Sequence, residues 1–113
     1  MRKFEKKQIE DFVALLSQVH DEIRKSAENK DYTKAMELLT QCQEGAVAAG
    51  ELIEKTEGQE FPTIVRLEEY CETVYELYVS FASDCEISAN KIYKRLKKSL
   101  IQIENSVRND IKA

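Results

Sequence analysis

The side chains best suited to chemistry in this chain are one histidine and three cysteines. His20 is the only imidazole, so any metal site or Cys/His pair would have to use it. Cys42, Cys71 and Cys85 lie on separate segments without the C-x-x-C spacing that zinc sites favour. An odd number of cysteines cannot all pair within one chain, which favours a reducing, cytoplasmic compartment. We predict no metal site and no cofactor, with Cys42 and Cys71 in the core. Cys85 lies in the break between two predicted helices, and a redox role is the alternative interpretation of this residue.

Carboxylates are the other abundant chemical group, and several gather on one segment: Glu68, Glu69, Glu72 and Glu76. Di-iron helical bundles need Glu-x-x-His motifs projecting inward from two helices, and this sequence has none. We therefore interpret these glutamates as a solvated helix face. With no recognisable catalytic or metal-binding spacing, the sequence predicts a protein that is not an enzyme.

The residues after His20 bear on a second hypothesis. Ile23 follows three positions later and Arg24 four positions later. A helical chain of this length with one histidine resembles histidine phosphotransfer domains, whose motif places Lys and Gly at those two positions. Here only the cation of Arg24 could contact phosphate. Phosphotransfer through His20 is the alternative function; the competing interpretation is a histidine on the polar face of its helix.

Composition sets the class of protein. The 113 residues fit one domain; 42% are hydrophobic and 34% charged, with three glycines and one proline, which favours long helices over short strands and tight turns. The net charge of −4 argues against nucleic acid as a partner. No segment approaches the roughly 20 apolar residues of a transmembrane helix, and no signal-peptide pattern precedes the first amphipathic segment.

Hydrophobic periodicity predicts four helices and the connections between them. The first spans residues 2–29, with apolar residues alternately three and four apart, as in a coiled-coil stripe. Asp31 is a good N-cap for a second helix that begins near Tyr32 and ends at Gly58. Pro62 closes the one clear linker, so the third helix begins near Thr63.

The fourth helix is predicted after a break around residues 83–86, with Asp84 or Ser88 as its cap. Since this break has neither Gly nor Pro, the third and fourth helices could instead form one kinked rod. We therefore predict an all-α, antiparallel four-helix bundle, with helical hairpins completed by dimerisation as the alternative. The small residues of Gly45–Gly50 are interpreted as a close helix crossing in the core.

Two groups of side chains form the candidate interaction surface. Three tyrosines on the third segment either cover the edge of the core with their hydroxyls in water or form a peptide-binding strip. A basic run on the fourth segment could meet the acidic face, an anionic surface or a protein partner. The candidate residues are Tyr70, Tyr75, Tyr78, Lys91, Lys94, Arg95 and Lys98.

Three stretches carry a family resemblance: residues 31–55, the Phe-Pro-Thr-Ile-Val run at 61–65 and the Ile-Gln-Ile-Glu-Asn-Ser-Val run at 101–107. They resemble the N-terminal helical region of Firmicutes proteins similar to CDP-glycerol glycerophosphotransferases. The resemblance implies that residues 1–113 are one helical domain from the N-terminal part of a longer bacterial protein. Any transferase chemistry would then lie downstream, so no catalytic residue is carried over. The helical pattern also still runs at Ala113 without a capping residue, as expected for such a fragment.

These observations favour a non-catalytic protein-interaction or oligomerisation module of a larger bacterial protein. Its predicted partner is a protein, with a second copy of the chain, giving a homodimer, as one candidate.

Overall fold

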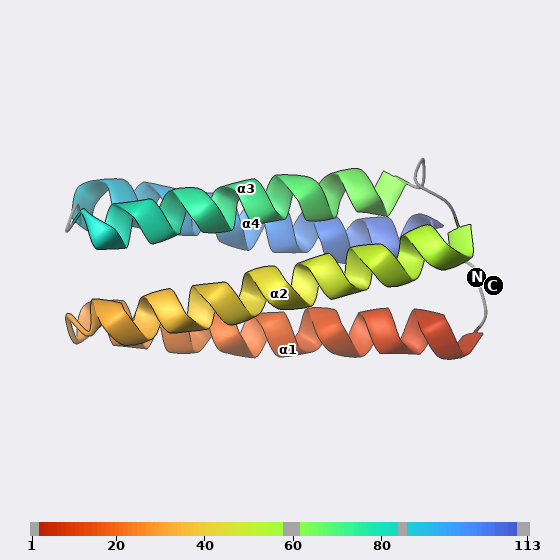
Figure 1. Ribbon diagram of the computed structural model, residues 1–113, viewed down its shortest axis with the longest axis horizontal. Helices are drawn as coiled ribbons and strands as arrows, with labels where there is room; N and C mark the ends of the chain where they lie inside the picture. The colour runs from red at the N-terminus through yellow and green to blue at the C-terminus, as the bar shows by residue number, and fades with distance from the viewer. Residues whose placement is uncertain (1–2, 58–61, 84–85, 111–113) are drawn as a thin grey trace.

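The computed structural model describes residues 3–57, 62–83 and 86–110, and within these ranges the chain folds into four helices (Figure 1). The helices are α1 (Lys3–Glu28), α2 (Tyr32–Glu57), α3 (Pro62–Ala82) and α4 (Glu86–Asp110). Neighbours in the chain run antiparallel and side by side, and α4 returns beside α1. The molecule is 43 Å long and about 20 Å across, as its 21 and 19 Å extents show. The prediction of an all-α, antiparallel four-helix bundle is confirmed.

The break between the third and fourth segments is real, because α3 ends at Ala82 and α4 starts at Glu86 and packs back along α3. A single kinked rod is therefore wrong. Since α4 begins at Glu86, Ser88 lies inside the helix and is not its cap; Asp84 lies outside the described residues. The apolar stripes of the four helices cover one another within one chain. A second copy of the chain is therefore not needed to bury them.

The α1–α2 connection shows how polar residues end one helix and start the next. Lys30 has a φ of 61°, in the left-handed region. Its amide donates to the Ala27 carbonyl and the Asp31 amide donates to the Ser26 carbonyl, which is the Schellman arrangement. The Asp31 carboxylate then accepts from the Lys34 amide at 3.2 Å, which confirms the predicted N-cap.

The core runs the length of the bundle, and every helix contributes to it. Its largest fully buried hydrophobic side chains are Ile23, Leu39, Ile53, Tyr70, Leu77, Leu96 and Ile103. Burying a side chain of this size stabilises a fold by roughly 1.5–3 kcal/mol, so this core is the main source of stability. Across the described ranges, none of the helices combines the length and apolar character needed to cross a membrane.

The two glycines of α2 allow close approach of its neighbours to different degrees. A Cβ on Gly45 would lie 2.6 Å from the ring edge of Phe12 on α1, whereas a Cβ on Gly50 would lie 3.9 Å from a methyl carbon of Leu67 on α3. The close crossing predicted for Gly45–Gly50 is therefore present at Gly45, and Gly50 has room for a methyl group.

We expect Gly50→Ala to stabilise the fold by about 0.5–1 kcal/mol, because Ala restricts the unfolded chain and fits the available space. Gly45→Ala gains the same propensity but must displace Phe12, an overpacking cost of about 1–3 kcal/mol, and should be destabilising. Urea denaturation of the two variants checks this, and a larger gain at Gly45 than at Gly50 would contradict the close crossing.

Candidate functional site

One polar cluster lies inside the bundle, and each helix supplies one member. His20 of α1 is 2% exposed, and its Nε2 lies 2.5 Å from the hydroxyl of Tyr70 of α3, in a hydrogen bond whose donor depends on the imidazole tautomer. The two rings stack at 7°. The Cys42 thiol of α2 lies near Tyr70 and affects its protonation, and the Tyr93 hydroxyl of α4 donates to the His20 carbonyl at 2.9 Å.

Burial dominates the protonation of this cluster. It lowers the pKa of His20 to about 4, with the negative charge of Asp21 opposing the shift and the positive charge of Lys97 adding to it. Burial also raises the pKa of the Cys42 thiol to about 11 and raises the pKa of Tyr70. At neutral pH the cluster is therefore uncharged, which is the form a buried polar group favours.

This geometry disfavours phosphotransfer through His20. Its Nε2 is bonded to Tyr70 and shielded from solvent, while the guanidinium of Arg24 lies 3.3 Å from the carboxylate of Glu28. The interpretation of His20 as a polar-face residue is also wrong, because the side chain is in the core. The spacing contained the signal: His20 lies four residues after Leu16 and three before Ile23, on the buried stripe itself.

Two of the three cysteines lie within the described residues, and both are free thiols. Cys42 is buried, as predicted, and Cys71 is half-buried at the edge of the core. Cys85 lies outside the described residues. Among the residues that the structure does describe, no three His, Cys, Asp or Glu side chains come together as metal ligands.

The three candidate tyrosines do not share one surface. Tyr70 is fully buried, whereas Tyr75 is 63% and Tyr78 is 37% exposed. The prediction that Tyr70 belongs to an interaction surface is therefore wrong. The alternative prediction, that its ring covers the edge of the core with the hydroxyl in water, is also wrong. The sequence spacing again indicated burial, since Tyr70 lies three residues after Leu67 and four before Val74, on the apolar stripe of α3. Tyr75 and Tyr78 remain available to a partner.

The basic run lies on the opposite flank of α3 from these tyrosines. Its four candidate members are all exposed: Lys91, Lys94, Arg95 and Lys98. Arg95 forms an ion pair with Glu76 of α3 at 2.7 Å, and Lys98 lines the same shallow groove between α3 and α4. Part of the basic run therefore meets the acidic helix of its own chain, one of the three roles considered for it.

Tyr75 and Tyr78 lie on the side of α3 that faces α2. Leu67 contacts Gly50 of α2, and the edge of α3 continues from Leu67 through Cys71, Tyr75 and Tyr78 at spacings of three and four, which keeps them on one face. At the far end of this edge, Phe81 stacks on Tyr32 of α2 with ring centroids 5.5 Å apart.

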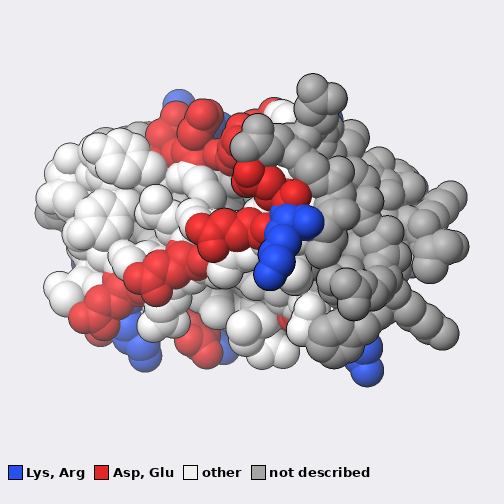
Figure 2. All heavy atoms as spheres, turned by 45° about the vertical axis from the view of Figure 1, so that its right-hand side comes forward, with Lys and Arg blue, Asp and Glu red and all other residues white. Residues whose placement is uncertain are grey.

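The matching edge of α2 runs through Met36, Gln43, Val47 and Gly50, and Val47 is 49% exposed. We call the surface formed by these two edges the α2–α3 face. Four exposed glutamates lie one residue, about 100° of helix rotation, beyond edge residues: Glu37, Glu44 and Glu51 on α2, and Glu68 on α3. Glu72 lines the groove between α3 and α4. Figure 2 shows this side of the molecule, with Asp and Glu side chains in two rows, uncharged surface between them on the left and a Lys or Arg side chain where the rows come together near the centre.

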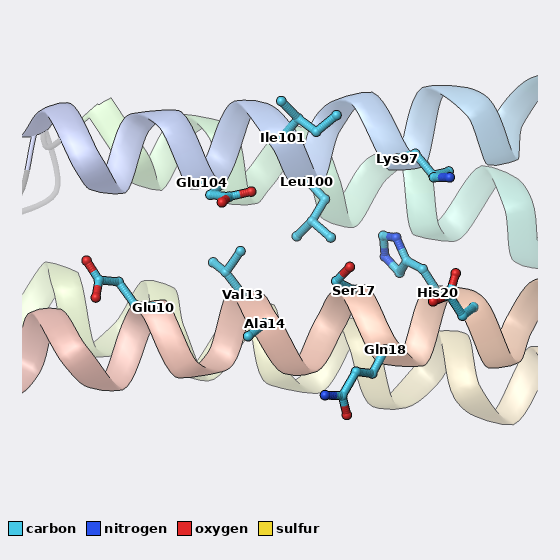
Figure 3. A pocket seen from close by; sticks show the side chains of 11 residues that line it. Glu10, Val13, Ala14, Ser17, Gln18, His20, Lys97, Leu100, Ile101 and Glu104 are labelled. Atoms are coloured by element: carbon cyan, nitrogen blue, oxygen red, sulfur yellow. The ribbon is translucent and has the colours of Figure 1, made fainter.

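A separate groove of about 730 Å³ opens between α1 and α4, the least closely packed neighbouring pair (Figure 3). Val13 and Leu100 form its apolar wall, while Glu10, Lys97 and Glu104 bring charges of both signs. His20 also lines the groove, and its Nε2 is bonded to Tyr70.

Comparison with known proteins does not extend this description. No protein-family model matches the chain, and the searches of curated proteins and of solved structures give no significant match. A functional proposal must therefore be argued from the chain's own surface.

Proposed function

We propose that this chain is a non-catalytic protein-interaction or oligomerisation module of a larger bacterial protein, and that the α2–α3 face is its contact surface. The observation that carries the proposal is the exposure of three large side chains within five residues of α3: Tyr75 at 63%, Tyr78 at 37% and Val79 at 42%. Grouped apolar exposure is characteristic of binding surfaces, and tyrosine is enriched in them.

The internal chemistry agrees with a binding role. The imidazole and the buried thiol are held neutral in the core, and the imidazole is bonded to Tyr70. A cytoplasmic location is part of the proposal, since the thiols of Cys42 and Cys71 are unpaired. The larger bacterial protein rests on the resemblance of residues 31–55, 61–65 and 101–107.

Site-specific photo-crosslinking tests this proposal. Benzoylphenylalanine would replace Tyr75 in the full-length protein in cells of the source organism, with Leu15 as the matched control position. Leu15 is also apolar and 57% exposed, but it lies on α1. We expect a discrete adduct at position 75, identified by mass spectrometry as this chain or another protein, and none at position 15. Equal adducts at both positions, or none at 75, would reject the α2–α3 face as the contact surface.

Light scattering of the purified chain over a range of concentrations then separates the two forms of the proposal. A mass that doubles with concentration identifies self-association. A constant monomer mass together with an adduct at position 75 identifies a different protein partner.

A further inference from the structure

We propose that the partner on the α2–α3 face is a basic amphipathic helix: a segment with apolar side chains along one stripe, flanked on both sides by Lys or Arg. This inference rests on the proposed function, because it specifies the chemistry of the partner for the same surface. Three features of the surface lead to it: its shape, its apolar centre and the sign of its borders.

The shape comes from the packing of α2 against α3. The two antiparallel helices are in contact near both ends of the face, at Tyr32 with Phe81 and at Gly50 with Leu67. Two antiparallel helices in contact leave a line between their axes along which a third helix can lie. A third helix placed there buries residues at spacings of three, four and seven.

The apolar centre supplies the contacts that exclude water. Val47 lies on the α2 side, and Tyr75 and Tyr78 lie on the α3 side with half-buried Cys71 beside them. A tyrosine ring gives a large contact area with few rotatable bonds, and its hydroxyl can remain at the wet edge of an interface. The centre therefore suits Leu, Ile or Phe side chains projecting from a partner helix.

The borders select the sign of the partner's flanking charges. Glu37, Glu44 and Glu51 are spaced by seven residues, so the row on α2 extends for about 21 Å at 1.5 Å per residue. Glu68 borders the other side. Arg66, also exposed on α3, is paired with Glu69 at 3.2 Å. Acidic borders along both sides attract a helix with Lys or Arg beside its apolar stripe and repel an acidic one.

The test uses purified chain and three fluorescent peptides of roughly 18 residues, about 27 Å long as helices. The first places Leu on one face and Lys on the other; the second replaces every Lys by Glu; the third scrambles the Leu-Lys composition. We expect fluorescence anisotropy to show binding of the first peptide only. Binding should weaken markedly between about 0.05 M and 0.5 M NaCl, because screening removes the contribution of the borders.

Substitutions then locate the binding site. Tyr75→Ser should weaken binding of the Leu-Lys peptide by roughly ten-fold, as loss of a central aromatic contact does. Glu44→Lys with Glu68→Lys should weaken it further and reduce the dependence on salt. The matched controls are Leu15→Ser and Glu22→Lys, exposed residues of α1, which should leave affinity unchanged. All these sites are on the surface, so each variant should fold.

Equal binding of the Leu-Glu or scrambled peptide, or equal losses in the α1 controls, would overturn the basic-helix partner. If crosslinking at position 75 succeeds while the Leu-Lys peptide does not bind, the proposed function stands and this inference fails; if both fail, both are rejected. If light scattering shows a dimer that is lost in Tyr75→Ser, the α2–α3 face is a self-association surface and the basic-helix partner is overturned, because the apolar stripe of α4 is buried in its own bundle.

Discussion

Acidification from neutral pH should destabilise the folded bundle through His20 by about 2 kcal/mol at pH 5 and about 3 kcal/mol at pH 4. The pKa of His20 is about 4 in the folded chain, against 6.5 for a histidine exposed to water, as in the unfolded chain. Between these values the unfolded chain binds a proton that the folded chain excludes, so stability falls as the pH drops below 6.5. The loss is complete below pH 4, where the histidine is protonated in both states. Urea denaturation at pH 7, 5 and 4 measures the effect.

His20→Gln is the control for this prediction. Glutamine can still hydrogen-bond to the Tyr70 hydroxyl but does not titrate in this range. The contribution of the many carboxylates is common to both proteins, so the difference between their pH profiles isolates His20. Parallel profiles, or a His20 pKa near 6.5 by NMR titration of the folded chain, would show that the imidazole is not shielded as the structure has it.

Leu39→Ala should have an effect of similar or greater size, costing about 2–5 kcal/mol of stability. Leu39 is 0% exposed and packs in the core, so its removal leaves a cavity as well as losing burial. Leu15→Ala removes the same atoms from α1 at a position that is 57% exposed and should change stability by less than about 0.5 kcal/mol.

Thermal or urea denaturation of the two leucine variants reports the difference directly. Typical domains have only about 5–15 kcal/mol of stability, so the Leu39 variant should unfold at a much lower urea concentration than wild type. Comparable losses at both positions would mean that α1 buries a different face in solution.

The sequence was sufficient for the helices because its local signals agree with its hydrophobic period. Asp31 caps α2 as its position predicted, and Pro62 opens α3, where a missing amide and a fixed φ suit the first turn. The hydroxyl of Thr63 lies 3.1 Å from that of Ser106 on α4, so it joins two helices.

Contacts between side chains on different helices depend on which helix faces meet in the bundle. A single sequence does not specify that arrangement. His20 and Tyr70 are fifty residues apart and polar by type, so each looked like a surface residue until the four-helix packing brought them together across the core. Lys30 was missed for a local reason. The left-handed residue after a helix is usually Gly, and here lysine adopts that conformation.

The acidic borders of the α2–α3 face are a second feature that depends on which helices lie side by side. The glutamates of α3 were recognised as a solvated face, and they are exposed. Their relation to Tyr75, Tyr78 and the glutamates of α2 required the antiparallel pairing of the two helices. The basic run was grouped with the tyrosines because both were near in sequence, yet Arg95 binds Glu76 on the other flank of α3.

The buried hydrogen bond between His20 and Tyr70 also gives the bundle a unique alignment. An apolar core tolerates a neighbour that slides by one helical turn, about 5.4 Å, because one aliphatic contact replaces another. Such a slip of α1 against α3 would separate Nε2 from the phenol and leave two buried polar groups unsatisfied, at roughly 1–3 kcal/mol each. Alternative registers are thereby penalised, and a single arrangement of helices presents the same outer surface in every molecule.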